Sequence, residues 1–341
     1  MGRRSEPTPC LFALSESRVL GSAVAAQAGI PLGQLEERNF EGGEFKLRPL
    51  ESVRSRAVFV LQVLTGTADA PLAQRLLRLL FLLRGLGDAG AEHRVALVPY
   101  LAFARKDRRT QPRDPVSSRY VAELLESAGA QRVVAIDVHN AAAFDNAFRV
   151  PTDHLTALPL IVHHFATTLA GAPIAVASPD VGGIKRAQIF RELLARRLAR
   201  DIDLVFIEKR RAGDVVSGGS IVGAVADKAV ILIDDLCATG GTLVRAAAAC
   251  RAAGALSVHA AVAHAPLAAG LEKMIASPDI ASAVVTDAAG VPLGPRAAAP
   301  QPDAGKLTVL TVAPLLGLAV KRMLEGRPLA PLLDRWPLGP E

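Results

Sequence analysis

The sequence predicts an α/β protein in which mostly parallel sheets, flanked by helices, are divided between two domains. Three observations lead to this prediction. Short apolar runs recur along the chain, helical patterns alternate with them, and 341 residues are more than one domain of ordinary size requires. Half of the residues are hydrophobic, so each domain can bury a core of its own. Aromatic residues make up only 4%, so those cores are expected to be aliphatic.

The expected strands are apolar runs without the alternation that a solvent-facing strand shows, which is typical of strands buried on both faces of a parallel sheet. In chain order they are 58–63, 95–98, 133–138, 174–177, 204–207, 230–233 and 258–263. Helical patterns are expected over 70–86, 118–128, 185–199 and 242–253. The segment 307–326 adds a final strand and helix.

A repeated arrangement favours two domains of one type. The segments 129–139 and 254–264 each run from a glycine at a helix end, through a strand, to a histidine, with the same offset at both ends. We therefore predict domains over 1–152 and 153–326 and a tail over 327–341, with the final helix packing back on the first domain. The Pro/Ala/Gly-rich segment 287–305 is expected to be a flexible insertion.

The charge balance points to anionic partners. The formal net charge is +6 and the isoelectric point about 9.5, which suits phosphates, nucleotides or nucleic acid, although an arginine-rich proteome gives the same balance. Nucleic-acid binding usually needs aromatic side chains among the cations, and the basic segment 105–113 holds none. Nucleic acid is therefore not an expected partner.

The cysteines and the apolar segments indicate the cellular compartment in which the protein is expected. Cys10, Cys237 and Cys250 fit neither a zinc nor a disulfide framework, so a reducing cytoplasm is expected. The N-terminal apolar run has four residues, too few for a signal peptide. The long uncharged stretch 252–271 contains glycine, proline and histidine, so we expect a turn, a strand and a loop there rather than a membrane span.

The stretch IDDLCATGGT, residues 233–242, carries the clearest chemistry. A buried strand runs into Asp234 and Asp235, and a Thr/Gly turn then opens a helix. Backbone N–H groups at such a turn point outward, and glycines let an anion approach closely. We expect 238–242 to bind a phosphate monoester and the two carboxylates to accept from vicinal hydroxyls or to hold a hard cation. The alternative is a turn whose acids only cap the helix.

This stretch resembles the phosphoribosyl-binding loop of type I phosphoribosyltransferases and of ribose-phosphate pyrophosphokinases. The resemblance implies that Asp234 and Asp235 hold the ribose hydroxyls of ribose 5-phosphate. It implies further that the 5-phosphate binds to Ala238, Thr239, Gly240, Gly241 and Thr242. The loop itself does not separate the two families, so other segments have to.

Two segments resemble the ATP-binding parts of ribose-phosphate pyrophosphokinases. The first, ARKDR, is similar to the family's YARQDR, with lysine in place of glutamine; it implies that Arg105 and Lys106 contact ATP while Asp107 braces them. The second, FEGGE, is similar to the family's FSDGE, with glycine in place of aspartate, and it implies that Phe40 stacks on adenine from a neighbouring subunit. The implied ATP-binding residues of this second segment are Phe40, Gly42, Gly43 and Glu44. Taken alone, ARKDR can equally be a solvated basic loop.

Three further segments complete the resemblance. IDVH and SPDVGG are similar to the family's DLH and SPDVGG, which implies that His139 and Asp180 bind Mg²⁺. EKRR is similar to the family's DKRR, which implies a mobile loop over 207–219 whose Lys209 and Arg211 stabilise the transition state. Taken singly, these are also typical of a structural histidine, a capped turn and a solvated charge cluster.

With these motifs in family order from about 40 to 326, the sequence is identified as a member of the ribose-phosphate pyrophosphokinase family. The resemblance implies two tandem type I phosphoribosyltransferase-like domains. It also implies transfer of the β,γ-diphosphoryl group of ATP to the 1-hydroxyl of ribose 5-phosphate, Mg²⁺ as cofactor and a homo-oligomer, either dimer or hexamer. No membrane partner is expected. The alternatives are a non-catalytic regulatory subunit of the same family and a phosphoribosyltransferase.

Overall fold

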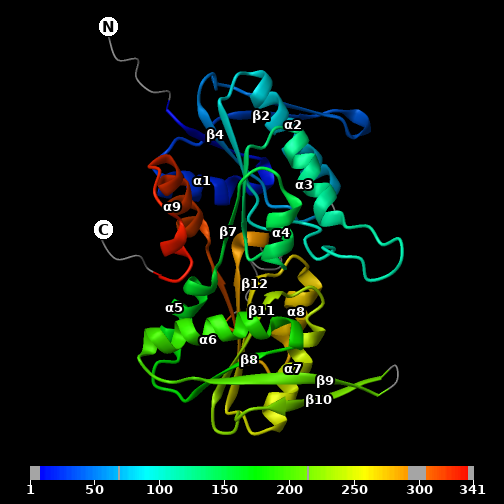
Figure 1. Ribbon diagram of the computed structural model, residues 1–341, viewed down its shortest axis with the longest axis vertical. Helices are drawn as coiled ribbons and strands as arrows, with labels where there is room; N and C mark the ends of the chain where they lie inside the picture. Colours follow the sequence, from blue (N-terminus) through cyan, green and yellow to red (C-terminus); the bar gives the residue numbers. More distant parts are fainter. Residues whose placement is uncertain (1–7, 68–69, 213–214, 291–304, 337–341) are drawn as a thin grey trace. The chain divides into compact units, whose positions relative to one another are not determined.

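The computed structural model describes residues 8–67, 70–212, 215–290 and 305–336, with the backbone alone described over 208–212 and 215–220. The chain divides into two units (Figure 1). Unit 1 comprises Met1–Leu155 and Val312–Leu329, and unit 2 comprises Thr156–Thr311 and Ala330–Glu341. Both units are α/β layers, and each is described separately below.

Unit 1 contains a five-stranded, fully parallel sheet in the order β1-β4-β5-β6-β7. The strands are β1 (Cys10–Ala13), β4 (Ala57–Leu61), β5 (His93–Leu97), β6 (Arg132–Ile136) and β7 (Thr152–Leu155). The expected strands near 58, 95 and 133 are therefore confirmed. β1 and β7 were not predicted, because four residues are too few to show a period and β7 begins with the polar Thr152 and Asp153.

Helices cover this sheet, and a two-stranded hairpin lies beside it. On one face pack α2 (Leu72–Asp88), α3 (Ser117–Ser127) and α4 (Ala141–Ala147), whose apolar residues meet those of the strands in one core. The antiparallel hairpin consists of β2 (Leu35–Asn39) and β3 (Phe45–Pro49). Its alternating exposed and half-buried side chains in β3 are those of a hairpin with one face in solvent.

The last helix of the fold, α9 (Ala313–Leu324), belongs to unit 1 and packs against α1 (Arg18–Ala28). Gly317 allows the two helices to approach closely. A methyl group added there would lie 2.3 Å from Cβ of Gln27 and 3.0 Å from the carbonyl oxygen of Val24. The predicted strand and helix of 307–326 are both present, as β14 (Leu307–Leu310) and α9.

Unit 2 contains a seven-stranded sheet in the order β10-β9-β8-β11-β12-β13-β14, parallel except for the β9–β10 pair. Its strands are β8 (Ile174–Ser178), β9 (Asp203–Ala212), β10 (Val215–Val222), β11 (Ala229–Leu236), β12 (Ser257–His264), β13 (Ser282–Thr286) and β14. The expected strands near 174, 204, 230 and 258 are confirmed. The expectation of a loop over 207–219 is wrong, because much of this segment forms the β9–β10 hairpin, with Arg211 opposite Val216.

Helices cover both faces of the unit 2 sheet. Alternate residues of β11 point to opposite faces, so Ile231 and Ile233 pack with α5 (Leu158–Thr168) and α6 (Ile184–Leu198). Val230 and Leu232 pack with α7 (Gly241–Ala252) and α8 (Ala268–Ala276). Being buried on both faces explains why this strand is continuously apolar in sequence.

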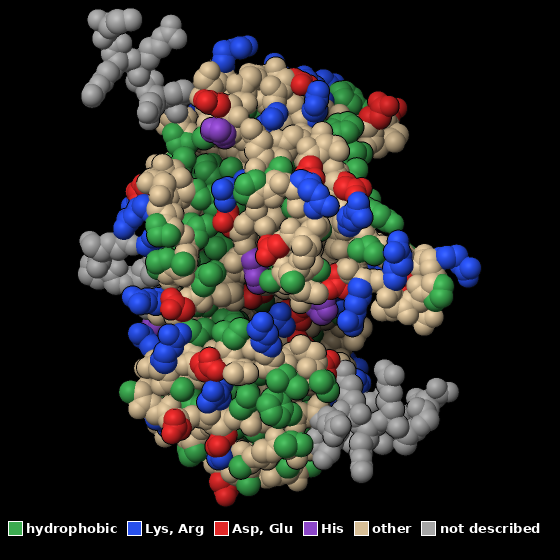
Figure 2. All heavy atoms as spheres, in the orientation of Figure 1, with side chains coloured by type: hydrophobic (Ala, Val, Ile, Leu, Met, Phe, Trp, Pro, Cys, Tyr) green, Lys and Arg blue, Asp and Glu red, His purple; other side chains and the backbone are tan. Residues whose placement is uncertain are grey.

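Three expectations concern the rest of the chain. Of the predicted insertion 287–305, the short turn Asp287–Ala289 is described, and 291–304 lie outside the described residues. Within the described ranges, none of the helices combines the length and the apolar character that crossing a bilayer requires. On the face drawn in Figure 2, Lys and Arg side chains are interspersed with Asp and Glu rather than gathered in one patch.

Candidate active site

The two predicted carboxylates of unit 2 lie at the carboxyl end of β11 and share one cation. Nη1 of Arg186, in the first turn of α6, lies 3.4 Å from Asp235 Oδ1 and 3.8 Å from Asp234 Oδ1. The backbone N–H of Asp235 also donates to Asp234 Oδ1 at 2.9 Å. All three side chains are largely buried, with 9–18% of their surface exposed. The arrangement is therefore an Asp–Asp–Arg cluster, in which Arg186 is a member that the sequence analysis did not assign.

Burial and mutual repulsion perturb the titration of this pair. The pKa of Asp234 is raised to about 7, chiefly by burial. The hydrogen bond with Asp235 and the charge of Asp235 add to this rise, and the charge of Arg186 opposes it. The pair therefore takes up its second negative charge only near neutral pH. One guanidinium is not enough to compensate two carboxylates, so the cluster favours an added cation or hydroxyl donors.

Asp180 lies at the neighbouring strand end. β8 pairs with β11 in parallel, with Ala177 opposite Leu232. After β8, Asp180 caps the short turn Val181–Gly183 by accepting from the Gly183 N–H at 3.3 Å. A methyl group added at Gly183 would lie 2.7 Å from Ser178 Oγ and 3.9 Å from Asp234 Oδ1, so this turn approaches the aspartate pair closely.

The loop 238–242 forms a tight turn whose geometry depends on glycine. Gly240 has φ +70°, where a side chain would be strained, and Gly241 is the first residue of α7. The α8 helix supports this loop from one side, since a methyl group added at Gly270 would lie 2.2 Å from the carbonyl oxygen of Ala238. The N-terminus of α7 thus follows directly on a glycine turn, and helix N-termini of this kind favour anions.

Two cations that the sequence analysis missed lie beside this loop. Measured from a methyl group added at Gly241, Nη1 of Arg245 is 3.2 Å away and Nζ of Lys273 is 3.7 Å away. Arg245 lies one turn into α7 and Lys273 lies in α8. The sequence contained no signal for Lys273, because the stretch 252–271 was expected to hold a turn, a strand and a loop but no helix, and the approach of α8 depends on tertiary packing.

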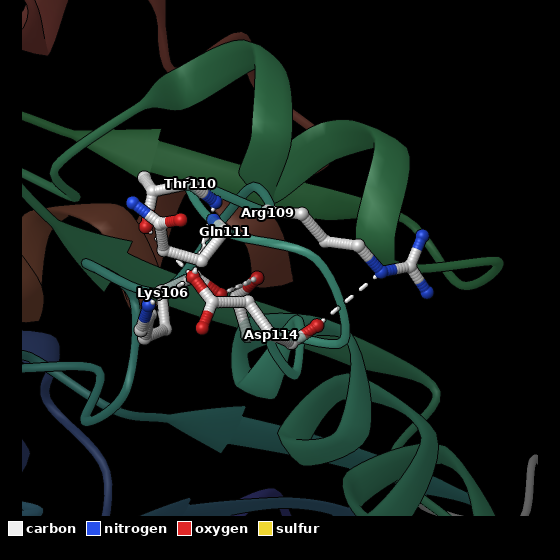
Figure 3. Close-up of polar contacts among 6 residues, drawn as sticks. Lys106, Arg109, Thr110, Gln111 and Asp114 are labelled. Atoms are coloured by element: carbon white, nitrogen blue, oxygen red, sulfur yellow. Dashed lines mark hydrogen bonds and ion pairs between the residues drawn. The ribbon is translucent and has the colours of Figure 1, made fainter.

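In unit 1, the predicted basic segment forms a loop after β5 that is organised by Asp114 (Figure 3). Asp114 Oδ2 accepts from Lys106 Nζ at 3.0 Å and from the hydroxyl of Thr110 at 2.7 Å. It also accepts from the backbone N–H groups of Thr110 and Gln111, both at 3.1 Å. These hydrogen bonds, that of the Thr110 hydroxyl foremost and then that of Lys106, hold the pKa of Asp114 well below its usual range.

The expectation that Asp107 braces Lys106 is wrong in this structure, because Asp114 is the carboxylate that contacts Lys106. Asp107 instead accepts from Nδ2 of Asn140 at 2.8 Å. Asn140 directly follows His139 and caps α4. The loop after β5 is thereby tied to the end of β6, so that Arg105, Lys106, Asp107 and the exposed His139 lie along one edge of the unit 1 sheet.

The remaining predicted residues lie on two hairpins. Phe40 starts the β2–β3 connection, 42% exposed, with the guanidinium of Arg38 5.1 Å from its ring centroid. Gly42 and Gly43 have φ +79° and +89°, and Glu44 is exposed. Lys209 and Arg211 lie in β9, and their side chains are outside the described part of the structure.

These groups offer two kinds of binding chemistry. The edge of unit 2 presents carboxylates beside a glycine turn, which suits a sugar that carries hydroxyls and a phosphate. The edge of unit 1 presents cations, which suit a polyphosphate. Over the described residues, no group of three or more His, Cys, Asp or Glu could hold a metal ion unaided. Mg²⁺ commonly binds through one or two carboxylates plus substrate phosphates, so single carboxylates such as Asp180 fit that ion.

The loop after β11 also contains a thiol, that of Cys237, which is not suited to catalysis. Cys237 is buried, and burial raises its pKa to about 11. The thiol therefore stays protonated at neutral pH and is a packing group rather than a nucleophile. All three cysteines are free and buried.

Comparison with known proteins gives the family. Residues 9–129 match the model of the N-terminal domain of ribose phosphate pyrophosphokinase, and residues 159–286 match that of the phosphoribosyl transferase domain. Ribose-phosphate pyrophosphokinase 1 of Streptococcus pneumoniae is 37% identical over 328 residues, which are 95% of this chain and 96% of that protein. The protein of the same name from Streptococcus agalactiae is 35% identical over the same length.

A solved structure agrees with these matches. The crystal structure of phosphoribosylpyrophosphate synthetase from Mycobacterium smegmatis superposes with a TM-score of 0.82 at 32% identity, covering 94% of this chain and all of that one. The predicted tandem of two phosphoribosyltransferase-like domains is therefore confirmed. The chain belongs to the ribose-phosphate pyrophosphokinase family of diphosphotransferases.

Proposed function

We propose that this chain makes phosphoribosyl pyrophosphate by transferring the β,γ-diphosphoryl group of ATP to the 1-hydroxyl of ribose 5-phosphate, with AMP as the second product. The oxygen of the 1-hydroxyl forms a bond to the β-phosphorus, the bond from that phosphorus to AMP breaks, and the hydroxyl proton is lost. The observation that carries the proposal is the Asp–Asp–Arg cluster beside an open glycine turn, in a chain that matches the family over nearly its whole length.

Ribose 5-phosphate is assigned to unit 2. Asp234 and Asp235 accept hydrogen bonds from the ribose hydroxyls, and Arg186 limits the repulsion between the two carboxylates. The 5-phosphate binds at Ala238, Thr239, Gly240, Gly241 and Thr242, where backbone N–H groups and two threonine hydroxyls are available. Because the loop is braced by α8, the sugar is oriented rather than merely captured, as in-line transfer requires.

ATP is assigned to unit 1. Arg105 and Lys106 bind the phosphates, and Asp107 fixes the loop through Asn140. Lys106 is already paired with Asp114, so it must reorient or share its donors when ATP binds. The adenine end is assigned to Phe40, Gly42, Gly43 and Glu44 on the β2–β3 connection, which in a homo-oligomer comes from a neighbouring subunit. We propose such a homo-oligomer, either a dimer or a hexamer.

Mg²⁺ is the proposed cofactor, with His139 and Asp180 as the residues that hold it. When bound to ATP, this ion offsets the negative charge of the phosphates. The proposed compartment is the cytoplasm, in keeping with three cysteines that are free and buried.

The direct test is formation of AMP and phosphoribosyl pyrophosphate from ATP, ribose 5-phosphate and Mg²⁺, followed with a coupled assay for AMP. We expect both products in equal amounts. If neither forms while the purified chain is folded, the catalytic assignment is wrong and the regulatory-subunit alternative stands. Release of ADP instead of AMP would mean transfer of a single phosphoryl group and would also contradict the proposal.

Lys209 and Arg211 are proposed to stabilise the transition state by neutralising charge on the transferring group. For Lys209→Ala we expect turnover to fall by roughly a hundredfold to a thousandfold, with an unchanged melting temperature, because β9 is held by its backbone ladder. The matched control is Lys321→Ala, an exposed helical lysine of α9 that has no assigned role. Near-normal turnover in Lys209→Ala would remove this residue from the mechanism.

A further inference from the structure

Two cations from different helices converge on the glycine turn of unit 2. Nη1 of Arg245 and Nζ of Lys273 lie 3.2 Å and 3.7 Å from the point that a methyl group at Gly241 would occupy, and Oγ1 of Thr239 lies 3.8 Å from the same point. The first residue belongs to α7 and the second to α8. Three hydrogen-bond donors therefore lie beside the backbone of Gly241, at the first residue of α7.

These two cations have no counter-charge within the part of the protein that the structure describes. Neither makes a hydrogen bond or ion pair there, whereas Lys106, Lys228 and Arg186 all meet carboxylates. Two like charges held near one point repel each other, although exposure to solvent weakens the repulsion. An anion bound beside Gly241, within reach of both side chains, would convert the repulsion into two attractive, charge-assisted interactions.

The packing of α8 accounts for the position of Lys273. Gly270 brings α8 against the loop, where a methyl group would come within 2.2 Å of the Ala238 carbonyl oxygen. Lys273 follows three residues later and so lies on the same face of the helix. The close contact at Gly270 thus directs Lys273 toward the loop. Looser packing of α8 against the loop would move the charge of Lys273 away from it.

We propose that Arg245 and Lys273 bind the 5-phosphate of the sugar together with the backbone N–H groups of the loop, and so select a phosphate monoester over an unphosphorylated sugar. This inference rests on the proposed function, since it adds two residues to the proposed ribose 5-phosphate site. Because the 5-phosphate takes no part in bond making or breaking at the 1-hydroxyl, the two side chains act on substrate affinity and not on the chemical step.

The test is a steady-state comparison of wild type, Arg245→Gln, Lys273→Gln and the double variant. We expect KM for ribose 5-phosphate to rise about threefold to tenfold in each single variant and by more than tenfold in the double variant. KM for ATP and kcat at saturating sugar phosphate stay near the wild-type values. Glutamine keeps much of the side-chain length, so folding should be preserved, and melting temperatures verify this.

Three controls separate phosphate binding from a structural effect. Arg84→Gln and Lys321→Gln remove exposed helical cations far from the loop in sequence and leave KM for ribose 5-phosphate unchanged. The exchange variants Arg245→Lys and Lys273→Arg keep the charge and restore most of the affinity. Ribose supplied with inorganic phosphate, in place of ribose 5-phosphate, is used equally poorly by wild type and double variant.

Calorimetric titration of the wild type and of the double variant with ribose 5-phosphate alone gives a readout independent of turnover. The double variant is expected to bind at least tenfold more weakly and to show a weaker dependence on salt. Wild-type affinity in the double variant would overturn this inference and leave the proposed function intact. Absence of AMP formation by the wild type would instead contradict the proposed function itself.

Discussion

At the scale of single residues, the aspartate pair combines binding chemistry with a cost to the fold. Burial moves the pKa of Asp234 from 3.8 to about 7, because an ionised carboxylate loses hydration there and faces Asp235. Between these two values the folded chain binds more protons than the unfolded chain, so this group lowers the free energy of unfolding as pH rises from about 4 to about 7. Substrate hydroxyls offset part of this penalty when they bind.

Replacement of Asp234 by asparagine removes the titrating group and tests this account. At pH 8 we expect Asp234→Asn to be more stable than wild type by about a few kcal/mol and therefore to unfold at a higher temperature. At pH 5 we expect the difference in stability to be smaller. Affinity for ribose 5-phosphate is lost in the same variant. Thermal unfolding at the two pH values provides the measurement, with the exposed Asp88→Asn as control. Equal differences at pH 5 and pH 8 would contradict the raised pKa.

Prediction from sequence reaches the residues of the site that lie in one continuous stretch. Asp234 and the glycines after it follow a strand and open a helix, so local chemistry alone indicates their role. Arg186, Arg245 and Lys273 come from other elements, and their relevance follows from distances that a single stretch does not contain. The contact between Lys106 and Asp114 was missed for a related reason, since an eight-residue loop can close on either of two nearby aspartates.

At the scale of elements, long periodic segments were predictable and short or irregular ones were not. Strands buried on both faces, such as β8 and β11, are continuous apolar runs. The sequence of the β9–β10 hairpin predicts a loop, because 213–219 is rich in glycine and serine and the strand character depends on pairing at the sheet edge. The helices α1, α5 and α8 are rich in small or apolar residues on several sides, which blurs their period.

The contact between α8 and the phosphate loop can be tested through its glycine. In Gly270→Ala the new methyl group would lie 2.2 Å from the Ala238 carbonyl oxygen, so helix or loop must move. We expect a loss of roughly 1–3 kcal/mol in stability and a several-fold higher KM for ribose 5-phosphate, with KM for ATP unchanged. Thermal unfolding and steady-state kinetics measure the two effects.

The matched control is Gly85→Ala in α2, where an added methyl group meets nothing within 4 Å. That substitution should stabilise the chain by up to about 1 kcal/mol, since alanine is the better helix former. Equal behaviour of the two variants would show that α8 does not press on the loop.

At the scale of the whole molecule, the two units are not simply the first and second halves of the sequence. Unit 1 takes its last helix, α9, from the C-terminal part of the sequence. The apolar residues of α9 that are buried include Leu315, Leu316, Ala319 and Val320, so this helix contributes to a core and is no appendage. A periodic apolar pattern was enough to predict the helix, but its contact with α1 depends on Gly317, which gives no sequence signal of its own.

Gly317→Leu tests the contribution of α9 to unit 1. A side chain at this position would collide with Gln27 and Val24, so we expect the α1–α9 contact to open at a cost of roughly 1–3 kcal/mol. Amide hydrogen exchange should then accelerate in α1 and α9 and stay unchanged in β11 and β12. Lys321→Leu places the same side chain at an exposed position of α9 and leaves exchange in α1 as in wild type. Unchanged exchange in Gly317→Leu would contradict the tight packing.

The late position of α9 in the sequence also affects how the protein is made. All strands of the unit 2 sheet are synthesised with residues 156–311, but α1 has no covering helix until the ribosome has added α9. Domains usually acquire their structure in the order of synthesis. Unit 1 begins to leave the exit tunnel first, yet it receives its last helix only after the sheet of unit 2 has been synthesised. Until then a nascent chain presents the apolar side of α1 to chaperones.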